Sequence, residues 1–291
     1  MEYFLHILIL IGIYSILSVS LNLVAGYTGL LSVAHASFYG IGAYVTALLA
    51  LNFESHFIIN ILCAMALSGI MGAVIAVPSL RIHDDYFVIA TFAFQIIIFS
   101  ILNNWVSLTK GPMGLPGIPQ PVLFGFQISS HIAFLFFVSF FALITFLVAR
   151  RLVNSPFGRV LKAIREDEVF AASLGKNVAG FKITVFVVGA SLAAIAGSLY
   201  AYYITFIDPT SFTIMESIFI LSLVIIGGSG NLWGSVVGAI VLVTLPELLR
   251  FIGLPNAIAA NMRQIIYGAL LILFMMYRPQ GLIGEFSFKK Q

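Results

Sequence analysis

The sequence predicts an all-α protein that crosses a membrane several times. Three observations support this fold class: 61% of the residues are hydrophobic, only 9% are charged, and the mean hydropathy is +1.10. A soluble domain averages about 45–50% apolar and about 25% charged residues. Since a spanning helix needs about 20 mostly apolar residues, we expect about eight or nine transmembrane helices in a single transmembrane domain, residues 1–291.

Apolar runs separated by polar or glycine-rich breaks give the individual helices. We expect them at about residues 4–24, 30–51, 57–77, 86–105, 132–149, 183–204, 215–227, 233–249 and 264–277. Of the ten prolines, only Pro246 lies well inside one of these runs, as expected for a ring that removes a helical N–H. Residues 26–51 either cross the membrane or re-enter it, and re-entry lowers the count to eight.

Positive charge is concentrated in the loop 150–182. This loop holds seven of the fourteen Lys and Arg residues, namely Arg150, Arg151, Arg159, Lys162, Arg165, Lys176 and Lys182. Nine crossings place it on the same side as Arg81 and the tail 278–291, and leave Lys110, Arg250 and Arg263 on the other. Because Lys and Arg gather on the cytoplasmic side, we expect the loop and the C-terminus to be cytoplasmic. The same rule accounts for the basic composition without a nucleic-acid partner.

Two distant segments share a weak internal repeat, Leu23–Tyr44 and Leu223–Leu242. Each is an apolar run, a glycine break and a helix with spaced glycines. Paired broken helices often mark the translocation path of a transporter, although small residues also let helices pack closely. The pathway candidates in these segments are Asn22, Gly26, Thr28, His35, Gly40, Gly227, Gly228 and Gly230. A hydrogen-bonded packing role is the alternative for His35.

Enzyme signatures are missing from the sequence. It has no P-loop GxxxxGK[ST], no HExxH and no GxSxG, and its five histidines show no metal-ligand spacing. We therefore expect no catalytic residue, metal or cofactor. Charged residues within the predicted helices are also scarce, which argues against an ion-coupled carrier. A pathway for a neutral or mostly apolar solute, driven by another chain, fits better.

The loop 150–182 contains the signals for two short helices. Ser155-Pro156 starts the first, with Ser as the N-cap and Pro at the first helical position. The acids 166–168 form a favourable first turn for the second, and Gly175 suits its left-handed end. Phe170 and Leu174 lie one turn apart on one face. A short capped helix with two apolar side chains suits a groove on a partner protein better than a plain solvated connector.

The sequence AIREDEVFAASLGKNVAGFK, residues 163–182, resembles the coupling loop by which permeases of ATP-binding-cassette (ABC) importers dock on their ATPases. Other stretches resemble the branched-chain amino acid permease family, in particular its LivM-like member. They are LNLVAGYTGLLSVAHASFYGIGAY, DDYFVIATFAF, GPMGLPGIP, IIGGSGNLWGSVVGAIVL and YRPQGLIG. The resemblance covers nearly the whole chain. Gln95, a further pathway candidate, departs from it, because the family often carries an acid there.

The resemblance implies an importer subunit of the bacterial cytoplasmic (inner) membrane. Its partners would be a homologous permease, two cytoplasmic ABC ATPases and an extracytoplasmic substrate-binding protein. The substrate would be Leu, Ile, Val or a related amino acid; urea, short amides and sugars, which related permeases carry, remain alternatives. The ATPase-coupling residues implied are Arg165, Glu166, Asp167, Glu168, Phe170, Ala171, Ala172, Leu174 and Gly175.

Overall fold

The computed structural model describes residues 2–53, 55–80, 84–123 and 126–251, with short pieces between 265 and 283. Its longer helices are α1 (Glu2–Leu21), α2 (His35–Phe53), α3 (Phe57–Ser79), α4 (Asp84–Asn104), α6 (His131–Asn154), α9 (Val178–Ile204), α10 (Ile214–Gly227) and α11 (Leu232–Phe251). The shorter ones are η1 (Asn22–Gly26), α5 (Val106–Thr109), η2 (Gly111–Met113), α7 (Pro156–Glu166), α8 (Glu168–Ser173) and η3 (Pro209–Phe212). The all-α prediction is confirmed.

Six of these helices, one of them α1 continued through η1, are long and apolar enough to cross a membrane, and a seventh crossing results if α10 and α11 count as one broken span. The expected eight or nine is therefore not confirmed among the described residues. The 14 residues of α10 extend only about 21 Å, against a hydrocarbon core of about 30 Å. Most of the ninth expected helix, 264–277, lies outside the described residues.

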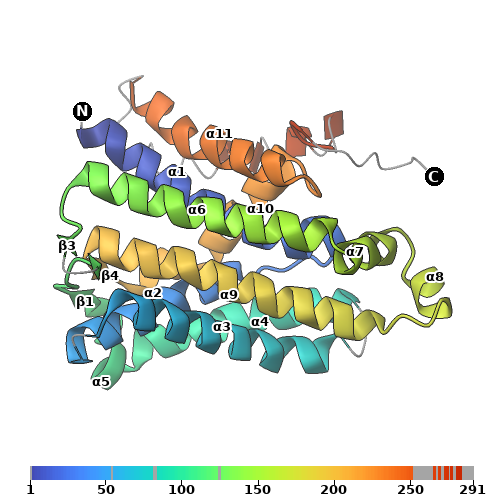
Figure 1. Ribbon diagram of the computed structural model, residues 1–291, viewed down its shortest axis with the longest axis horizontal. Helices are drawn as coiled ribbons and strands as arrows, with labels where there is room; N and C mark the ends of the chain where they lie inside the picture. The colour runs from blue at the N-terminus through green and yellow to red at the C-terminus, as the bar shows by residue number, and fades with distance from the viewer. Residues whose placement is uncertain are drawn as a thin grey trace.

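Small residues bring the central helices together. α9 packs against α2 and α3. A Cβ on Gly42 of α2 would lie 2.6 Å from the Ala194 Cα, and one on Gly197 would lie 2.7 Å from the Ala43 nitrogen. Helices in membranes associate through such close backbone approaches. α9 is therefore the central helix of the bundle, and α1, α6 and α11 lie along its other side (Figure 1).

The bundle has two distinct ends. The N-terminus and the strands lie at one end, and α7 and α8 lie at the opposite end (Figure 1). The strands are two antiparallel pairs of two residues each: β1 (Leu115–Pro116) with β4 (Phe206–Ile207), and β2 (Val122–Leu123) with β3 (Phe126–Gln127). They belong to the Gly/Pro-rich connection before α6 and to the exit of α9.

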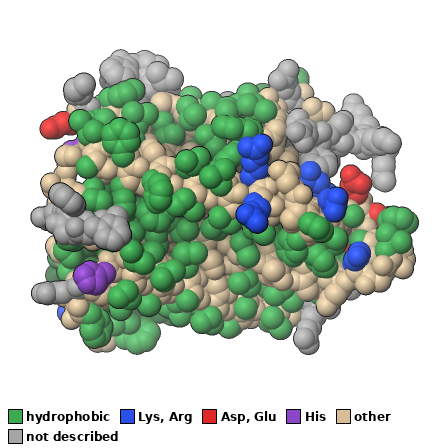
Figure 2. Space-filling model, in the orientation of Figure 1, with side chains coloured by type: hydrophobic (Ala, Val, Ile, Leu, Met, Phe, Trp, Pro, Cys, Tyr) green, Lys and Arg blue, Asp and Glu red, His purple; other side chains and the backbone are tan. Residues whose placement is uncertain are grey.

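The outer surface is mostly hydrophobic. Figure 2 shows apolar side chains along the length of the visible face, with Lys and Arg side chains gathered toward the end that carries α7 and α8. Exposed side chains such as Ile70, Ile89 and Phe136 come from α3, α4 and α6. Such a surface is stable in lipid and not in water, so the lipid-facing sides belong to these helices.

Candidate functional site

Asn22 joins the two glycine breaks that the sequence sets far apart. It opens η1, a π-helical turn, and is fully buried. Its amide nitrogen donates to the Asn231 carbonyl at 2.8 Å and to Ser235 Oγ at 2.6 Å. Its amide oxygen accepts from the Gly230 N–H at 2.8 Å. π-helical turns are frequent at functional sites, and this one connects the two halves of the predicted repeat.

Gly26 is required by the closeness of this contact. A Cβ at position 26 would overlap the Asn22 amide oxygen and would lie 2.6 Å from the Gly230 nitrogen. Atoms at that separation repel strongly, so any larger residue must push the second break away. Thr28 closes the same turn by donating its hydroxyl to the Val24 carbonyl at 2.6 Å. The first break is thus packed and hydrogen-bonded.

The second break is a sharp turn between α10 and α11, whose axes are bent by 120°. Gly228 has φ +127° and Gly230 has φ +83°, values that residues with a Cβ rarely adopt. The Asn231 carboxamide then caps α11 by accepting from the Trp233 N–H at 2.9 Å. Four residues reverse the chain direction only because two of them are glycine.

The C-terminal piece completes this turn. The Leu282 N–H donates to the Ile226 carbonyl at 2.8 Å, and the Ile283 N–H donates to the Gly227 carbonyl at 3.0 Å. The last carbonyls of a helix have no partner within that helix, so the tail supplies the missing donors to α10. It also fixes residues 282–283 at the end of the bundle where the two breaks meet.

Gln95 of α4 is the centre of a second buried polar cluster. Its amide oxygen accepts from the Ser37 N–H at 2.9 Å, from Ser37 Oγ at 2.8 Å and from Ser217 Oγ at 3.1 Å. Its amide nitrogen donates to the Phe212 carbonyl at 2.8 Å. Gln95 therefore holds together the first turn of α2, η3 and the first turn of α10. Gly40 lies beside it in space, with its Cβ position 3.0 Å from the Phe212 ring.

His35 lies between these two clusters. Its Nε2 is 2.7 Å from Ser20 Oγ, and its ring is 1% exposed. Its other ring nitrogen, Nδ1, has no hydrogen-bond partner among the described residues. His35 is thus buried and bonded through one ring nitrogen, and both the pathway role and the packing role stay predictions. Of the four polar pathway candidates Asn22, Thr28, His35 and Gln95, none is more than 4% exposed.

The loop 150–182 forms two short helices; Ser155 is the predicted N-cap of the first, and Asp167, predicted in the first turn of the second, is its N-cap. Ser155 caps α7 by accepting from the Gly158 N–H at 3.4 Å, and Pro156 is its first residue. Asp167 caps α8 by accepting from the Phe170 N–H at 2.8 Å. Glu166 was expected in the first turn of the second helix. It is instead the last residue of α7.

The end of α8 is a glycine-dependent Schellman motif. Gly175 has φ +76°. Its N–H donates to the Ala172 carbonyl at 2.9 Å, and the Lys176 N–H donates to the Ala171 carbonyl at 3.3 Å. This pair of bonds is the one that defines the motif. α8 is thus closed by its own sequence at both ends, although its six residues are fewer than the two turns expected.

α8 presents apolar side chains to the outside. Val169 is 79% exposed, Phe170 60% and Leu174 62%. Its opposite face is anchored: Ala171 packs with Ile164 and Val178 in a small separate core. We define the exposed set Val169, Phe170 and Leu174 as the α8 tip. Exposed apolar side chains that lie together mark sites of contact with another protein or with a membrane.

An ion pair joins the first turn of α8 to α9. Lys182 Nζ of α9 lies 2.6 Å from Glu168 Oε2, and the Lys182 side chain is only 2% exposed. A buried ammonium is costly unless it is paired, so this contact holds the first turn of α8 on α9. Lys182 was not singled out from the sequence, because a Lys at the end of a long polar loop carries no signal of burial.

Arg165, unlike the exposed residues of the α8 tip, reaches the two glycine breaks. Its guanidinium donates to the Gly26 carbonyl, and its second terminal nitrogen lies 3.3 Å from Ser229 Oγ. Burial lowers the pKa of this guanidinium, and the nearby Tyr27 raises it. Lys162, one turn earlier in α7, places its Nζ 5.7 Å from the Tyr27 ring centroid. α7 therefore contacts the first break through two cations.

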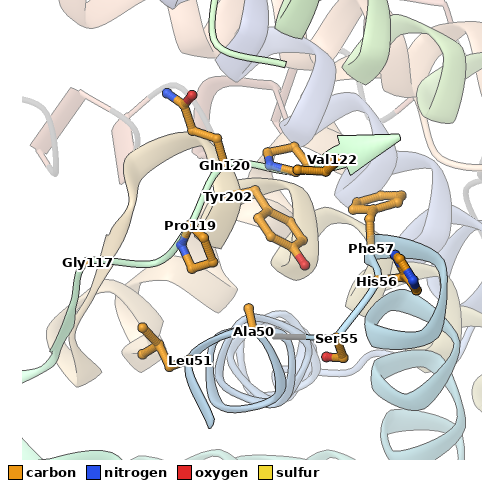
Figure 3. A pocket seen from close by; sticks show the side chains of 11 residues that line it. Ala50, Leu51, Ser55, His56, Phe57, Gly117, Pro119, Gln120, Val122 and Tyr202 are labelled. Carbon is orange, nitrogen blue, oxygen red and sulfur yellow. The ribbon is translucent and has the colours of Figure 1, made fainter. Parts of the chain in front are cut away.

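A cavity of about 540 Å³ lies at the other end of the bundle (Figure 3). Its walls come from the end of α2, the start of α3, the Gly/Pro-rich connection and Tyr202 of α9. The Tyr202 hydroxyl accepts from Asn60 Nδ2 at 2.7 Å, and Ser55 Oγ also bonds to Asn60. No permanently charged side chain is among the described lining residues.

The structure brings the predicted residues into three places. The break cluster contains Asn22, Gly26 and Gly230, with Thr28, Gly227 and Gly228 beside it; the inner cluster contains Gln95 and Gly40, with His35 between the two; the α8 region contains the coupling set apart from Arg165. Sequence reasoning missed Ser37, Ser217, Ser229, Asn231, Ser235 and Lys182. Among these only Asn231 carried a local signal, since an Asn before a helix is a common cap.

This arrangement is that of a multi-pass α-helical membrane protein with paired broken segments and a short helix, α8, that exposes apolar side chains at one end of the bundle. The sequence profile of the family described as "Branched-chain amino acid transport system / permease component" matches residues 3–275. The chain belongs to this family.

Individual relatives agree with this assignment. The chain is 34% identical to the high-affinity branched-chain amino acid transport system permease protein LivM of Salmonella typhimurium and to that of Escherichia coli, over 93% of this chain and 68% of each relative. It is 28% identical to the probable branched-chain amino acid transport permease protein LivM of Methanocaldococcus jannaschii, over 96% of this chain and 92% of that relative. It is 26% identical to the LivH permease protein of Escherichia coli, over 94% of this chain and 91% of that relative. No solved structure matches the chain.

Proposed function

We propose that this chain is the permease subunit of an ATP-driven ABC importer for branched-chain amino acids. The family match over residues 3–275 carries this proposal. The relatives named LivM and LivH are both permease proteins of branched-chain amino acid transport systems. An identity of 34% to one and 26% to the other supports a pairing of this chain with a second, LivH-like permease.

The α8 tip supplies the contact through which energy would enter. It is rigid, because Asp167 and Gly175 close the helix, and it is apolar where it meets the outside. An importer ATPase is cytoplasmic, so the end of the bundle with α7, α8 and residues 282–283 would face the cytoplasm of a bacterial cell, in agreement with the charge asymmetry. The N-terminal end would face the extracytoplasmic binding protein.

The cavity at the N-terminal end suits an apolar side chain better than a whole free amino acid. A zwitterion buried there would need partners for its ammonium and carboxylate groups, and the lining offers no permanent charge among the described residues. The pathway proper is therefore assigned to the polar break and inner clusters, which open only when the helices that close them move.

Uptake measurements in a strain that lacks the chromosomal copy of this gene test the proposal. Wild-type protein should restore ATP-dependent uptake of leucine, isoleucine and valine, and tagged protein should copurify with ABC ATPase subunits. Phe170→Ser combined with Leu174→Ser should abolish both, since each side chain is exposed and its loss leaves the bundle unchanged. Truncating a central interface residue costs about 2 kcal/mol or more, roughly 30-fold in affinity.

The matched control is Met113→Ser, which removes an apolar side chain that is 83% exposed at the other end of the bundle. It should leave ATPase association intact. Uptake that is driven by an ion gradient without ATP would overturn the proposal in favour of a secondary carrier, and uptake of urea, short amides or sugars instead would overturn the substrate.

A further inference from the structure

We infer that Arg165 is a positioning residue that transmits movement of the α7–α8 pair to the two helix breaks, and that it is not part of the surface that binds the ATPase. The inference rests on the proposed function. It separates Arg165 from the residues of the α8 tip, with which it is nearly contiguous in sequence.

α8 is rigidly connected to the turn of α7 that carries Arg165. Only Asp167 separates α7 from α8 in the chain, and its side chain caps α8. Ile164 of α7 and Ala171 of α8 pack in the same small core. A push on the α8 tip therefore moves the last turn of α7, which carries Arg165.

Arg165 reaches a pair of acceptors. One is the Gly26 carbonyl, at the last residue of η1, and the other is Ser229 Oγ, in the turn between α10 and α11. A guanidinium offers several N–H donors in a fixed planar arrangement, so a single side chain binds both segments at once. The carbonyls at the end of a helix also carry partial negative charge, which favours a cation there.

The two segments that carry these acceptors are bonded to each other. Asn22 bonds to the Gly230 N–H and to the Asn231 carbonyl, and the Gly26 Cβ position is occupied by the partners of this contact. Moving Arg165 therefore acts on both breaks together. Lys162 adds a second contact to the same region through the Tyr27 ring, and it lies on the same helix.

The test uses the complete importer in proteoliposomes, with partner permease, ATPases and binding protein, and measures both uptake of radiolabelled leucine and release of phosphate. Arg165→Gln should keep ATPase association and hydrolysis within about twofold of wild type while the leucine transported per ATP falls at least tenfold. Arg165→Lys, which keeps the charge but has a single nitrogen, should give an intermediate ratio. Ser229→Ala, which removes only one of the two acceptors, should also give an intermediate ratio. This variant tests the inference even if Arg165→Gln does not fold.

The control is Arg159→Gln, an exposed arginine on the same helix, which should leave both rates unchanged. A wild-type ratio of leucine to ATP in all three variants at Arg165 and Ser229 would overturn the inference while leaving the proposed function intact. Loss of ATPase association in Arg165→Gln would also overturn it, because Arg165 would then belong to the docking surface. If the wild-type complex itself transports no leucine, the proposed function fails instead.

Discussion

The two glycine breaks are alike in sequence but are held together in different ways. Beyond Thr28 the first break continues as a non-helical stretch, residues 29–34, that leads into α2. It is closed mainly by side chains: the Asn22 carboxamide, the Thr28 hydroxyl and the Gln95 carboxamide of α4, which accepts from the first turn of α2. The second break reverses direction within the residues between Gly227 and Leu232 and is closed mainly by backbone contacts. Substitutions at the second break should therefore destabilise the protein through steric overlap. Substitutions at the first break should destabilise it through lost hydrogen bonds.

The largest effect is expected at the second break. Gly238 of α11 packs directly on α10: its Cβ position overlaps the Leu223 carbonyl and lies 3.0 Å from the Gly227 Cα. Gly238→Val should therefore separate α10 from α11 and cost about 3 kcal/mol or more, the upper part of the range for overpacking. The measurement is thermal unfolding of the purified protein in detergent. Gly268→Ala, whose Cβ position has no heavy atom of the described residues within 4 Å, is the control and should not lower the midpoint of unfolding.

The next effect tests the side-chain bonds of the first break. Asn22→Ala removes the partner of the Gly230 N–H, of the Asn231 carbonyl and of Ser235 Oγ. A buried polar group left without a partner costs about 1–3 kcal/mol. Asn22→Ala should thus destabilise the protein by about 2 kcal/mol or more and abolish uptake. Ser235→Ala removes only one of these partners and should cost clearly less. Equal costs for the two variants would show that Asn22 does not join the breaks.

Local sequence rules could predict the loop 150–182 well, because caps act within a few residues. Ser155, Asp167 and Gly175 each stand where a short-range hydrogen bond requires them. The expected number of crossings is not confirmed among the described residues, in part because hydropathy does not show that α10 is only 14 residues long and is followed by a bend of 120°. The repeat indicated two similar breaks but could not show that they touch.

Contacts over long sequence separations account for the rest of the site. The partners of Asn22 come from residues more than 200 positions away, and the direction of Arg165 follows from where α7 packs. Nothing local distinguishes Arg165, which turns inward, from Arg159, which stays exposed. The same limit applies to Gln95, whose donors come from α2 and α10.

Gln95→Glu replaces one atom, the amide nitrogen, in the side chain of α4 that holds the start of α2. The new carboxylate keeps an acceptor for the Ser37 and Ser217 donors, but its second oxygen faces the Phe212 carbonyl in place of the amide N–H that now donates there. Burial disfavours the charged form of a carboxyl group, so we expect a loss of about 1–3 kcal/mol while the group is ionised. We expect a smaller loss at low pH, where the protonated carboxyl can donate to the Phe212 carbonyl; both losses are measured as a lower midpoint of thermal unfolding. Gln95→Met, of similar length, removes all four bonds and should lose more than the acid.

Thr28→Val is the smallest of these changes and the most direct test of how the first break is closed. It preserves the shape of the side chain but removes the hydroxyl that donates to the Val24 carbonyl at 2.6 Å and accepts from the Leu30 N–H at 3.4 Å. Since a typical intramolecular hydrogen bond contributes about 1 kcal/mol net, we expect a loss of roughly that size. Thr244→Val, which removes a comparable hydroxyl-to-carbonyl bond on the exposed side of α11, should cost less. If it costs as much as Thr28→Val, hydroxyl bonds matter equally across the bundle, and side-chain closure is not a special property of the first break.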